Sequence, residues 1–353
     1  MRPPTGSEGN RTRLQRGDLL VTITGNNVGN VAWVDHELGE AYISQHVGLV
    51  RLKEPSISDY VCRFLAPGSI GNWQISASQS GQSKPGLNLK NLEDFIIAVP
   101  ALRECKAIAE ALSDADALIE SLEQLIAKKR HIKQGAMLEL LTGKRRLPGF
   151  KRKWEKKQLG SHAVLKARIG WHGLTTKEYL KSGSYYLVTG TEFSRGRITW
   201  GDCHFVERSR FDQDPNIQLR TGDVLVTKDG TIGKVALVDE LSLPATLNSG
   251  VFVVRPREFA FDPRFFYCVM QSRVFSNFLA QLRVGSTINH LYQKDFVHFT
   301  FAAPPTIEEQ AAVASALLDI DASIAEFDTK LTKARAIKQG MMQELLTGRI
   351  RLV

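Results

Sequence analysis

Apolar residues recur at alternating spacings of three and four from Glu104 to Thr142, and the same pattern returns in the last fifty residues. This period is typical of a helix that buries one face against another helix. Pro100 precedes the first stretch and Pro304 the second, while Gly143 and Gly348 follow them as helix stops. The pattern predicts two long helices, each of about 39 residues and roughly 58 Å.

The predicted seam of the first helix runs through Leu118, Leu125 and Ile132, widened by residues one position further on. Two copies in one chain favour an intramolecular antiparallel pair over a dimerisation element, with a globular domain at each end of a rod. The residues expected to pack between the helices are Ile108, Leu112, Ile119, Leu122, Ile126, Val313, Leu317, Ile324, Phe327 and Leu331.

Outside the helices the pattern changes to short alternating runs, such as residues 19–23 and 224–227, which predict strands. Polar glycine loops at 25–30 and 229–234 lead into second strands at 31–34 and 235–238. We therefore expect an α/β (more strictly α+β) fold in which β-rich globular domains are separated by two long antiparallel coiled-coil helices.

The chain is an internal repeat, because residues 100–147 return as residues 305–352 with about half of the positions identical. Upstream, residues 17–22 match 222–227 and residues 81–83 match 285–287. Such a duplication predicts a pseudo-twofold arrangement. The expected division is 1–99 for the first globular domain, 100–147 for a central helical spacer, 148–303 for the second domain and 304–353 for a distal helical spacer. Since residue 13 aligns with residue 218, the first domain is expected to be N-terminally incomplete.

Charge points to a polyanionic partner. The formal net charge is +9, and residues 128–157 hold twelve Lys and Arg against two Glu. Such a cluster suits nucleic acid, although a solvated helix end would also carry cations. No apolar run is long enough to span a membrane, and residues 1–13 lack a signal sequence, so we expect a cytoplasmic protein.

The sequence lacks the common catalytic and cofactor motifs. We find no P-loop, no dinucleotide-binding G-x-G-x-x-G, no H-E-x-x-H and no G-x-S-x-G elbow. The four cysteines are scattered without metal-ligand spacing. We therefore expect no cofactor, no metal and no catalytic residue.

With these features, the chain resembles the specificity subunit of type I restriction-modification systems. The resemblance rests on the PPTIEEQ start of the second helix at 304–310, its IKQGMMQELLTGRIRL end at 337–352, and the GDVLVT strand with its GTIGK loop. It implies two target-recognition domains that each read half of a bipartite DNA site, held apart by the helices. It also implies double-stranded DNA, two adenine-methyltransferase (modification) subunits and ATP-driven restriction subunits as partners, and no catalysis by the chain itself.

Candidate DNA-contacting residues follow from side-chain chemistry, because cations and amides read bases and phosphates. In the second domain, Arg168 could fork onto guanine or stack on Trp171, and Glu192 could accept from a cytosine amino group. Lys228 and Lys234 suit phosphate. The full set in that domain is Arg168, Trp171, His172, Thr189, Glu192, Lys228, Thr231, Lys234, Ser286, Thr287, Asn289 and His290. Their counterparts in the first domain are Asn26, Asn27, Asn30, Gln82, Ser83 and Lys84.

Two other interpretations stay open at this point. The chain could be a coiled-coil scaffold that binds proteins and reads no DNA. It could also be an inactive, truncated specificity subunit.

Overall fold

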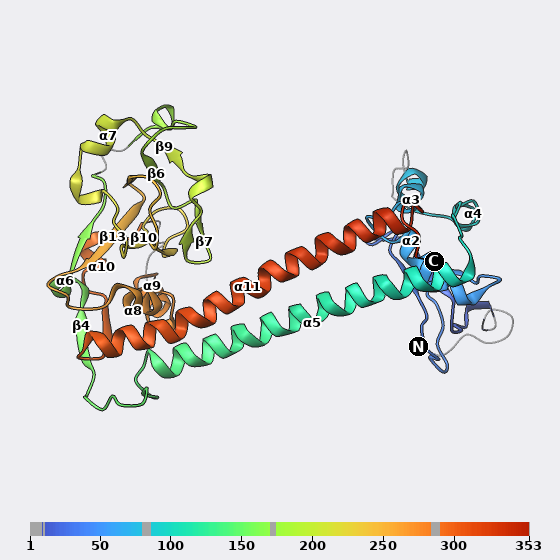
Figure 1. Ribbon diagram of the computed structural model, residues 1–353, viewed down its shortest axis with the longest axis horizontal. Helices are drawn as coiled ribbons and strands as arrows, with labels where there is room; N and C mark the ends of the chain where they lie inside the picture. Colours follow the sequence, from blue (N-terminus) through green and yellow to red (C-terminus); the bar gives the residue numbers. More distant parts are fainter. Residues whose placement is uncertain (1–8, 10, 80–85, 170–173, 284–289, 353) are drawn as a thin grey trace. The chain divides into compact units, whose positions relative to one another are not determined.

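The computed structural model describes residue 9 and residues 11–79, 86–169, 174–283 and 290–352. Two compact units are present: unit 1 comprises Met1–Ala127 with Glu326–Val353, and unit 2 comprises Lys128–Ala325 (Figure 1). The long helices α5 (Leu102–Leu140) and α11 (Ile307–Leu345) each contribute to both units. The four-part division expected from the sequence stays a prediction.

Unit 2 is built on a four-stranded antiparallel sheet of order β11-β10-β13-β5, with β5 at Ala163–Lys166, β10 at Val224–Thr227, β11 at Val235–Leu237 and β13 at Val251–Pro256. Strand β10 is fully buried, and only the last two residues of β13 are partly exposed. The sheet is therefore covered on both faces and forms the centre of the unit.

Smaller sheets and short helices complete unit 2. Strands β12 (Ala245–Leu247), β6 (Tyr186–Val188) and β9 (His204–Phe205) form one sheet, β14 (Thr300–Ala303) pairs with β4 (Glu155–Gln158), and β7 (Phe193–Ser194) pairs with β8 (Arg197–Ile198). The helices are α6 (Leu159–His162), η3 (Thr176–Glu178), η4 (Trp200–Asp202), α7 (Arg208–Asp212), η5 (Pro215–Ile217), α8 (Pro263–Met270), α9 (Arg273–Arg283) and α10 (Gln293–Phe296).

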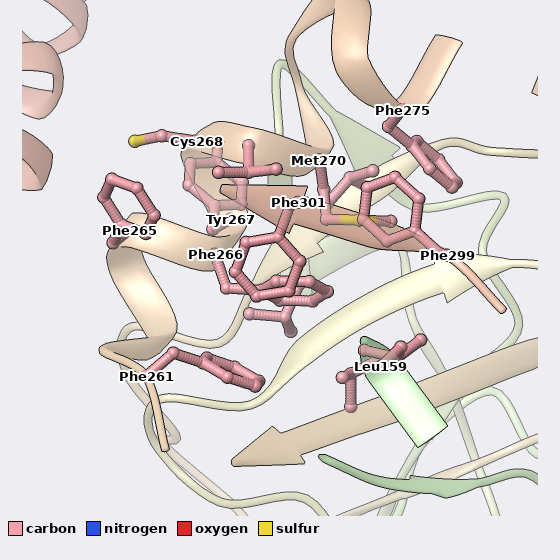
Figure 2. Packing of buried hydrophobic residues seen from close by; sticks show 14 of the residues in the cluster. Leu159, Phe261, Phe265, Phe266, Tyr267, Cys268, Met270, Phe275, Phe299 and Phe301 are labelled. Atoms are coloured by element: carbon pink, nitrogen blue, oxygen red, sulfur yellow. The ribbon is translucent and has the colours of Figure 1, made fainter. Parts of the chain in front are cut away.

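An aromatic core fixes α8 against the sheet of unit 2. Asp262 caps this helix by accepting hydrogen bonds from the Arg264 and Phe265 amides, and the helix then turns its apolar residues inward. In Figure 2, Phe261, Phe266 and Phe301 converge from different elements, with ring centroids 4.8 to 5.6 Å apart. Each buried ring contributes roughly 2 to 3 kcal/mol by leaving water.

Unit 1 repeats part of this plan. Its sheet has the order β2-β1-β3, with β1 at Leu19–Thr22, β2 at Val31–Trp33 and β3 at Val47–Val50. The pairing of Leu20 with Leu49 corresponds to that of Leu225 with Val253. Helices η1 (Pro55–Ile57), α2 (Ser58–Leu65), α3 (Asn72–Gln79) and α4 (Leu89–Glu93) follow.

A buried carboxylate holds the same place in each sheet. Asp18 of unit 1 pairs with Arg51 at 2.7 Å, and Asp223 of unit 2 pairs with Arg255 at 2.6 Å. Both carboxylates are buried and also accept from a backbone amide three residues upstream. The duplication therefore extends from the helices into the cores of both units.

Helices α5 and α11 lie antiparallel within each unit. In unit 1, Asp116 pairs with Lys338 and Glu123 with Arg335, and in unit 2 Lys133 pairs with Asp321 at 2.7 Å. Residue numbers thus rise along one helix as they fall along the other. The 205-residue repeat exchanges Asp116–Lys338 for Asp321–Lys133, so the pseudo-twofold repeat and the α+β class with antiparallel helices are confirmed.

Only part of the predicted seam is buried between the helices. Leu118, Leu125 and Ile132 are 54, 40 and 52% exposed and do not face the partner helix. The buried contact in unit 1 is made by Leu122, Ile126, Leu331 and Ala334, flanked by Ile119 and Phe327. Of the other expected packing residues, Ile108 and Leu112 belong to the core of unit 1, Val313 and Leu317 to that of unit 2, and Ile324 is half-buried. Within the described residues, none of the helices has the length and apolar character needed to cross a bilayer.

Candidate nucleic-acid interface

The repeated glycine loop of unit 2, residues 229–234, is a tight turn held by hydrogen bonds within the loop and to Thr227. Thr227 Oγ1 donates to the Thr231 carbonyl at 2.5 Å and accepts from the Lys234 amide at 2.9 Å. The Gly233 amide donates to the Thr227 carbonyl at 2.9 Å. Because the backbone groups are used inside the loop, the side chains of Thr231 and Lys234 project into solvent, where both are exposed.

Gly233 of this loop allows close packing against helix α9. Gly233 has a φ of +84°, and a methyl group there would lie 2.4 Å from Leu279 Cδ1 of α9. Gly29 repeats this in unit 1, with a φ of +91° and Ile75 Cγ2 at 2.6 Å. Gly230, by contrast, has nothing within 4 Å of that position and leaves the loop tip open. The tip is therefore the part of the loop that a phosphate backbone could approach.

A second segment lies beside this loop. Asp229 and His290 form a backbone bridge and a side-chain hydrogen bond, and the Leu291 amide donates to the Lys228 carbonyl at 2.8 Å. The ring of Tyr292 lies 4.6 Å from that of His290. Tyr292 is 54% exposed, so an exposed aromatic ring lies beside this loop.

The turn at residues 189–192 forms the third part of the surface. A methyl group on Gly190 would lie 2.6 Å from Thr227 Cγ2, which places this turn against the glycine loop. Glu192 is buried, and its carboxylate accepts from Thr189 Oγ1 at 2.7 Å and from the Gly190 amide at 2.9 Å. Glu192 therefore organises the turn, which corrects our expectation that it accepts from a base, while Thr191 stays exposed.

Arg168 is also removed from the set of expected contacts. It is 2% exposed, and its guanidinium donates to the Leu247 carbonyl, to Gln213 Oε1 and to Thr246 Oγ1 at 2.8, 3.0 and 3.2 Å. Burial, with the nearby Arg210 cation, lowers its pKa below the ordinary value for arginine. A side chain with its donors used inside the protein cannot fork onto a guanine.

The structure thus gathers Thr189, Lys228, Thr231, Lys234 and His290 from three separate segments. We call this surface the three-loop surface: residues 189–191, 228–234 and 290–294. Lys228 is half-buried, with its Nζ 5.3 Å from the centre of the Phe252 ring, so its cation is partly held by the core. Trp171, His172, Ser286, Thr287 and Asn289 lie outside the described residues.

Unit 1 carries the corresponding loop. Asn26, Asn27 and Asn30 are all exposed along it. The Leu87 amide donates to the Ile23 carbonyl at 2.9 Å, as Leu291 does to Lys228 in unit 2. Gln82, Ser83 and Lys84 lie outside the described residues.

Reasoning from the sequence missed Tyr292 and Lys294 at this surface. The Lys294 ammonium lies 5.5 Å from the centre of the Tyr292 ring, beside His290. A base can stack on an exposed ring and a phosphate can meet the cation. The alternation of aromatic and basic residues along His290-Leu291-Tyr292-Gln293-Lys294 was the available signal.

Eight of the twelve Lys and Arg in the basic cluster at 128–157 are exposed. Lys133 and Arg146 pair with carboxylates of α11, whereas the connection from α5 into β4 leaves its remaining cations in solvent. Those exposed cations are Lys144, Arg145, Lys151, Arg152, Lys153 and Lys156. They supply a positive surface on unit 2 besides the three-loop surface.

Comparison with known proteins assigns the class of protein. The family model for the type I restriction modification DNA specificity domain matches residues 8–128 and 151–334. The chain belongs to this family, whose members are DNA target-recognition subunits.

Individual relatives agree. The chain is 27% identical over 300 residues to the type I restriction enzyme MjaVIII specificity subunit of Methanocaldococcus jannaschii, covering 79% of this chain and 67% of that protein. It is 22% identical over 354 residues to the EcoBI specificity subunit of Escherichia coli, covering 95% and 73%. The structure of a type I restriction-modification S subunit from M. genitalium superposes with a TM-score of 0.65 at 16% identity, covering 95% and 84%, and so shares the fold.

Proposed function

We propose that this chain is the non-catalytic DNA-reading subunit of a type I restriction-modification complex. The observation that carries the proposal is the three-loop surface of unit 2, which combines exposed Thr191, Thr231 and Lys234 with the exposed side chains of Tyr292 and Lys294. Polar side chains and cations on adjacent loops suit base edges and phosphates in a groove.

The cysteines support a role without chemistry. Burial raises the pKa of the Cys203 and Cys268 thiols to about 12, so both stay protonated near neutral pH. A reactive cysteine requires the opposite shift, since the thiolate is the nucleophile. We accordingly assign the reactions of the complex to its other subunits.

The target proposed for this subunit is bipartite. The internal repeat supplies two related loops, at 25–30 and 229–234, one in each unit. Two related readers joined through paired helices would contact two half-sites and leave the intervening base pairs unread, as dimeric readers do when their half-sites lie about one helical turn apart. The helices would then set the spacing.

The proposed partners are two methyltransferase subunits and the ATP-driven restriction subunits. We propose that the chain assembles with them in the cytoplasm and that the complex binds DNA there. Exposed apolar residues on α5 in unit 1 support docking of a modification subunit: Leu118 and Leu125 lie seven residues apart and are 54 and 40% exposed. Exposed apolar residues that lie together mark interaction surfaces. Substituting both by Ser should weaken co-purification of the methyltransferase and leave the helix pair intact.

The proposal is tested by expressing the chain with a type I methyltransferase subunit from the same genome and mapping methylated adenines by single-molecule sequencing. A bipartite motif supports reading by both units. A palindrome built from one half-site would show that chains pair and that unit 2 alone reads. Absence of any motif, with the complex shown to assemble, would leave a scaffold or an inactive subunit.

A further inference from the structure

The two units differ in the strands that cover the edges of their sheets. In unit 2, β5 pairs with β13 and β4 pairs with β14. In unit 1, β3 corresponds to β13, and residues 96–99, which follow α4 as β14 follows α10, correspond to β14. Within the described part of unit 1, neither segment has a strand on its outer side. In the described part of unit 1, the outer sides of β3 and of residues 96–99 are therefore uncovered, whereas β5 and β4 cover the equivalent segments of unit 2.

The backbone of β3 shows which groups face the first open edge. In an antiparallel pair, alternate residues exchange hydrogen bonds with a given neighbour. The Ile23 amide donates to the His46 carbonyl at 2.9 Å, and the register then turns the backbone groups of Gly48 and Val50 toward β1. The backbone groups of Leu49 and Arg51 consequently face outward.

The equivalent groups in unit 2 are occupied. Val253 and Arg255, which correspond to Leu49 and Arg51, pair with Lys166 and Val164 of β5. The next pair outward is closed by the Arg257 amide, which donates to the His162 carbonyl at 2.9 Å.

The second open edge has the same one-sided bonding. On the inner side of residues 96–99, the Gln74 side chain makes the hydrogen bonds that a neighbouring strand would make. Its Nε2 donates to the Ile96 carbonyl at 2.9 Å and its Oε1 accepts from the Ile96 amide at 2.8 Å. Tyr60 Oη donates to the Ala98 carbonyl at 2.6 Å. By alternation, the backbone groups of Ile97 and Val99 face the outer side, where β4 lies in unit 2.

Apolar side chains are left uncovered along the same edges. Val99 is 52% exposed, whereas its counterpart Ala303 is 0% exposed. Val50 is half-buried, whereas Val254 is fully buried. In unit 2 the cover is supplied by Leu159, Ala163 and Leu165, which are all buried in the same core. One run, residues 155–166, thus provides both strands and the apolar cover.

We propose that unit 1 carries a strand-acceptor surface that binds a strand–turn–strand segment of another polypeptide. The segment has the chemistry of residues 155–166: two extended stretches joined by one short turn, with apolar side chains at the positions of Leu159, Ala163 and Leu165. Strand addition of this kind draws affinity from main-chain hydrogen bonds and specificity from alternate side chains. Residues 155–166 of this chain are paired with β13 and β14 within unit 2. The proposal stands independently of DNA reading.

The test uses the full chain and a fluorescent synthetic peptide with the sequence of residues 154–166. Anisotropy should report saturable binding, and amide exchange should slow at Leu49, Ile97 and Val99. A control peptide with aspartate in place of Leu159 and Leu165 should not bind. The variant L49P removes one outward amide from an edge strand, a position that tolerates proline, and should weaken binding by about tenfold or more. The matched variant L49T keeps the amide and should bind like the parent.

The variant I97P repeats the test at the second edge in case L49P does not fold. Binding that is unchanged in both proline variants would overturn the proposal. So would peptide protection confined to Val253 and Arg255, which would mean exchange with β5 of unit 2. Failure of the peptide to bind the parent chain would likewise reject a strand acceptor.

Discussion

Arg146 and Glu309 lie 163 residues apart in the sequence and form a bidentate ion pair. Arg146 Nε lies 2.7 Å from Glu309 Oε1, and Arg146 Nη2 lies 2.8 Å from Glu309 Oε2. The repeat exchanges this pair for Arg351 and Glu104, which are ion-paired in unit 1. In both units the carboxylate lies near the start of one long helix, is almost fully buried, and meets an arginine that follows the other helix. The pair ties the connection after each helix to the core.

Loss of Arg146 should therefore destabilise unit 2. R146A leaves the Glu309 carboxylate buried, with the Trp154 indole at 3.3 Å as its remaining side-chain donor, and should lower the free energy of unfolding by about 3 kcal/mol. R351A is the matched variant, and it should cost less because Arg351 is 59% exposed against 23% for Arg146. Denaturant titration measures both, and equal losses would contradict the role of burial.

The ion pairs of Asp116 predict acid sensitivity in unit 1. Partial burial alone would raise the pKa of Asp116, but hydrogen bonds from Lys338 and Arg63 outweigh it and hold the pKa below its ordinary 3.8. The stabilisation is then complete above that ordinary value and is lost as the pH falls through the lower folded value. The stability difference between the parent and D116N should be constant near neutral pH and shrink below about pH 4.

The control for this prediction is D114N, which removes an exposed carboxylate of the same helix. It should change stability little across the range. A D116N difference that persists undiminished at low pH would show that packing, and not charge, causes the loss.

The sequence predicted the helices well because their signals are local. Each has 39 residues, as expected, and begins within a few residues of its proline. The sequence left two adjacent apolar columns as candidates for the contact between the helices. Leu118 and Ile119 are both suitable, and the rotation of the helix that buries Ile108 and Leu112 in the unit 1 core selects Ile119.

The candidate site was harder to predict because it depends on distant contacts. Arg168 beside Trp171 resembles a reader of bases, yet its partners Thr246 and Leu247 lie nearly 80 residues away in the sequence. Thr231 and Lys234 lie exposed on the repeated loop, and their contact with DNA stays a prediction. A local sequence pattern does not show whether segments distant in the sequence will bury a residue.

Two glycines of the unit 2 loop should differ in their tolerance of a side chain. Gly233 and Gly230 both have positive φ, of +84° and +65°, so alanine strains either by about 1 kcal/mol. At Gly233 the added methyl would also meet Leu279 Cδ1 at 2.4 Å, and overpacking adds about 1 to 3 kcal/mol. Thermal unfolding should therefore show a larger loss for G233A than for G230A. Equal losses of stability would mean that α9 shifts to accommodate the methyl group at no energetic cost.

Lys234 should contribute to DNA binding through phosphate. K234A should weaken binding about equally for specific and unrelated duplexes and should reduce the slope of log affinity against log salt by about one. Titration of the assembled complex at several salt concentrations measures this slope. K330A, which removes an exposed cation of α11, serves as the control. A loss confined to one base position would instead make Lys234 a reader of sequence.

Leu122 and Leu125 provide a direct test of the helix pair. Leu122 is 7% exposed and packs with Ile126 and Leu331, whereas Leu125 is 40% exposed on the same helix. An aspartate at 122 would bury a charge without a partner, so L122D should unfold the helix pair and cost several kcal/mol, while L125D should be tolerated. Calorimetry of the two variants gives the difference in stability. If the helices set the spacing of a bipartite target, the complex with L122D should also lose its preference for one spacer length, which a panel of duplexes with altered spacers would report. An unchanged preference in a chain with separated helices would reject that role and leave the helices as a packing element alone.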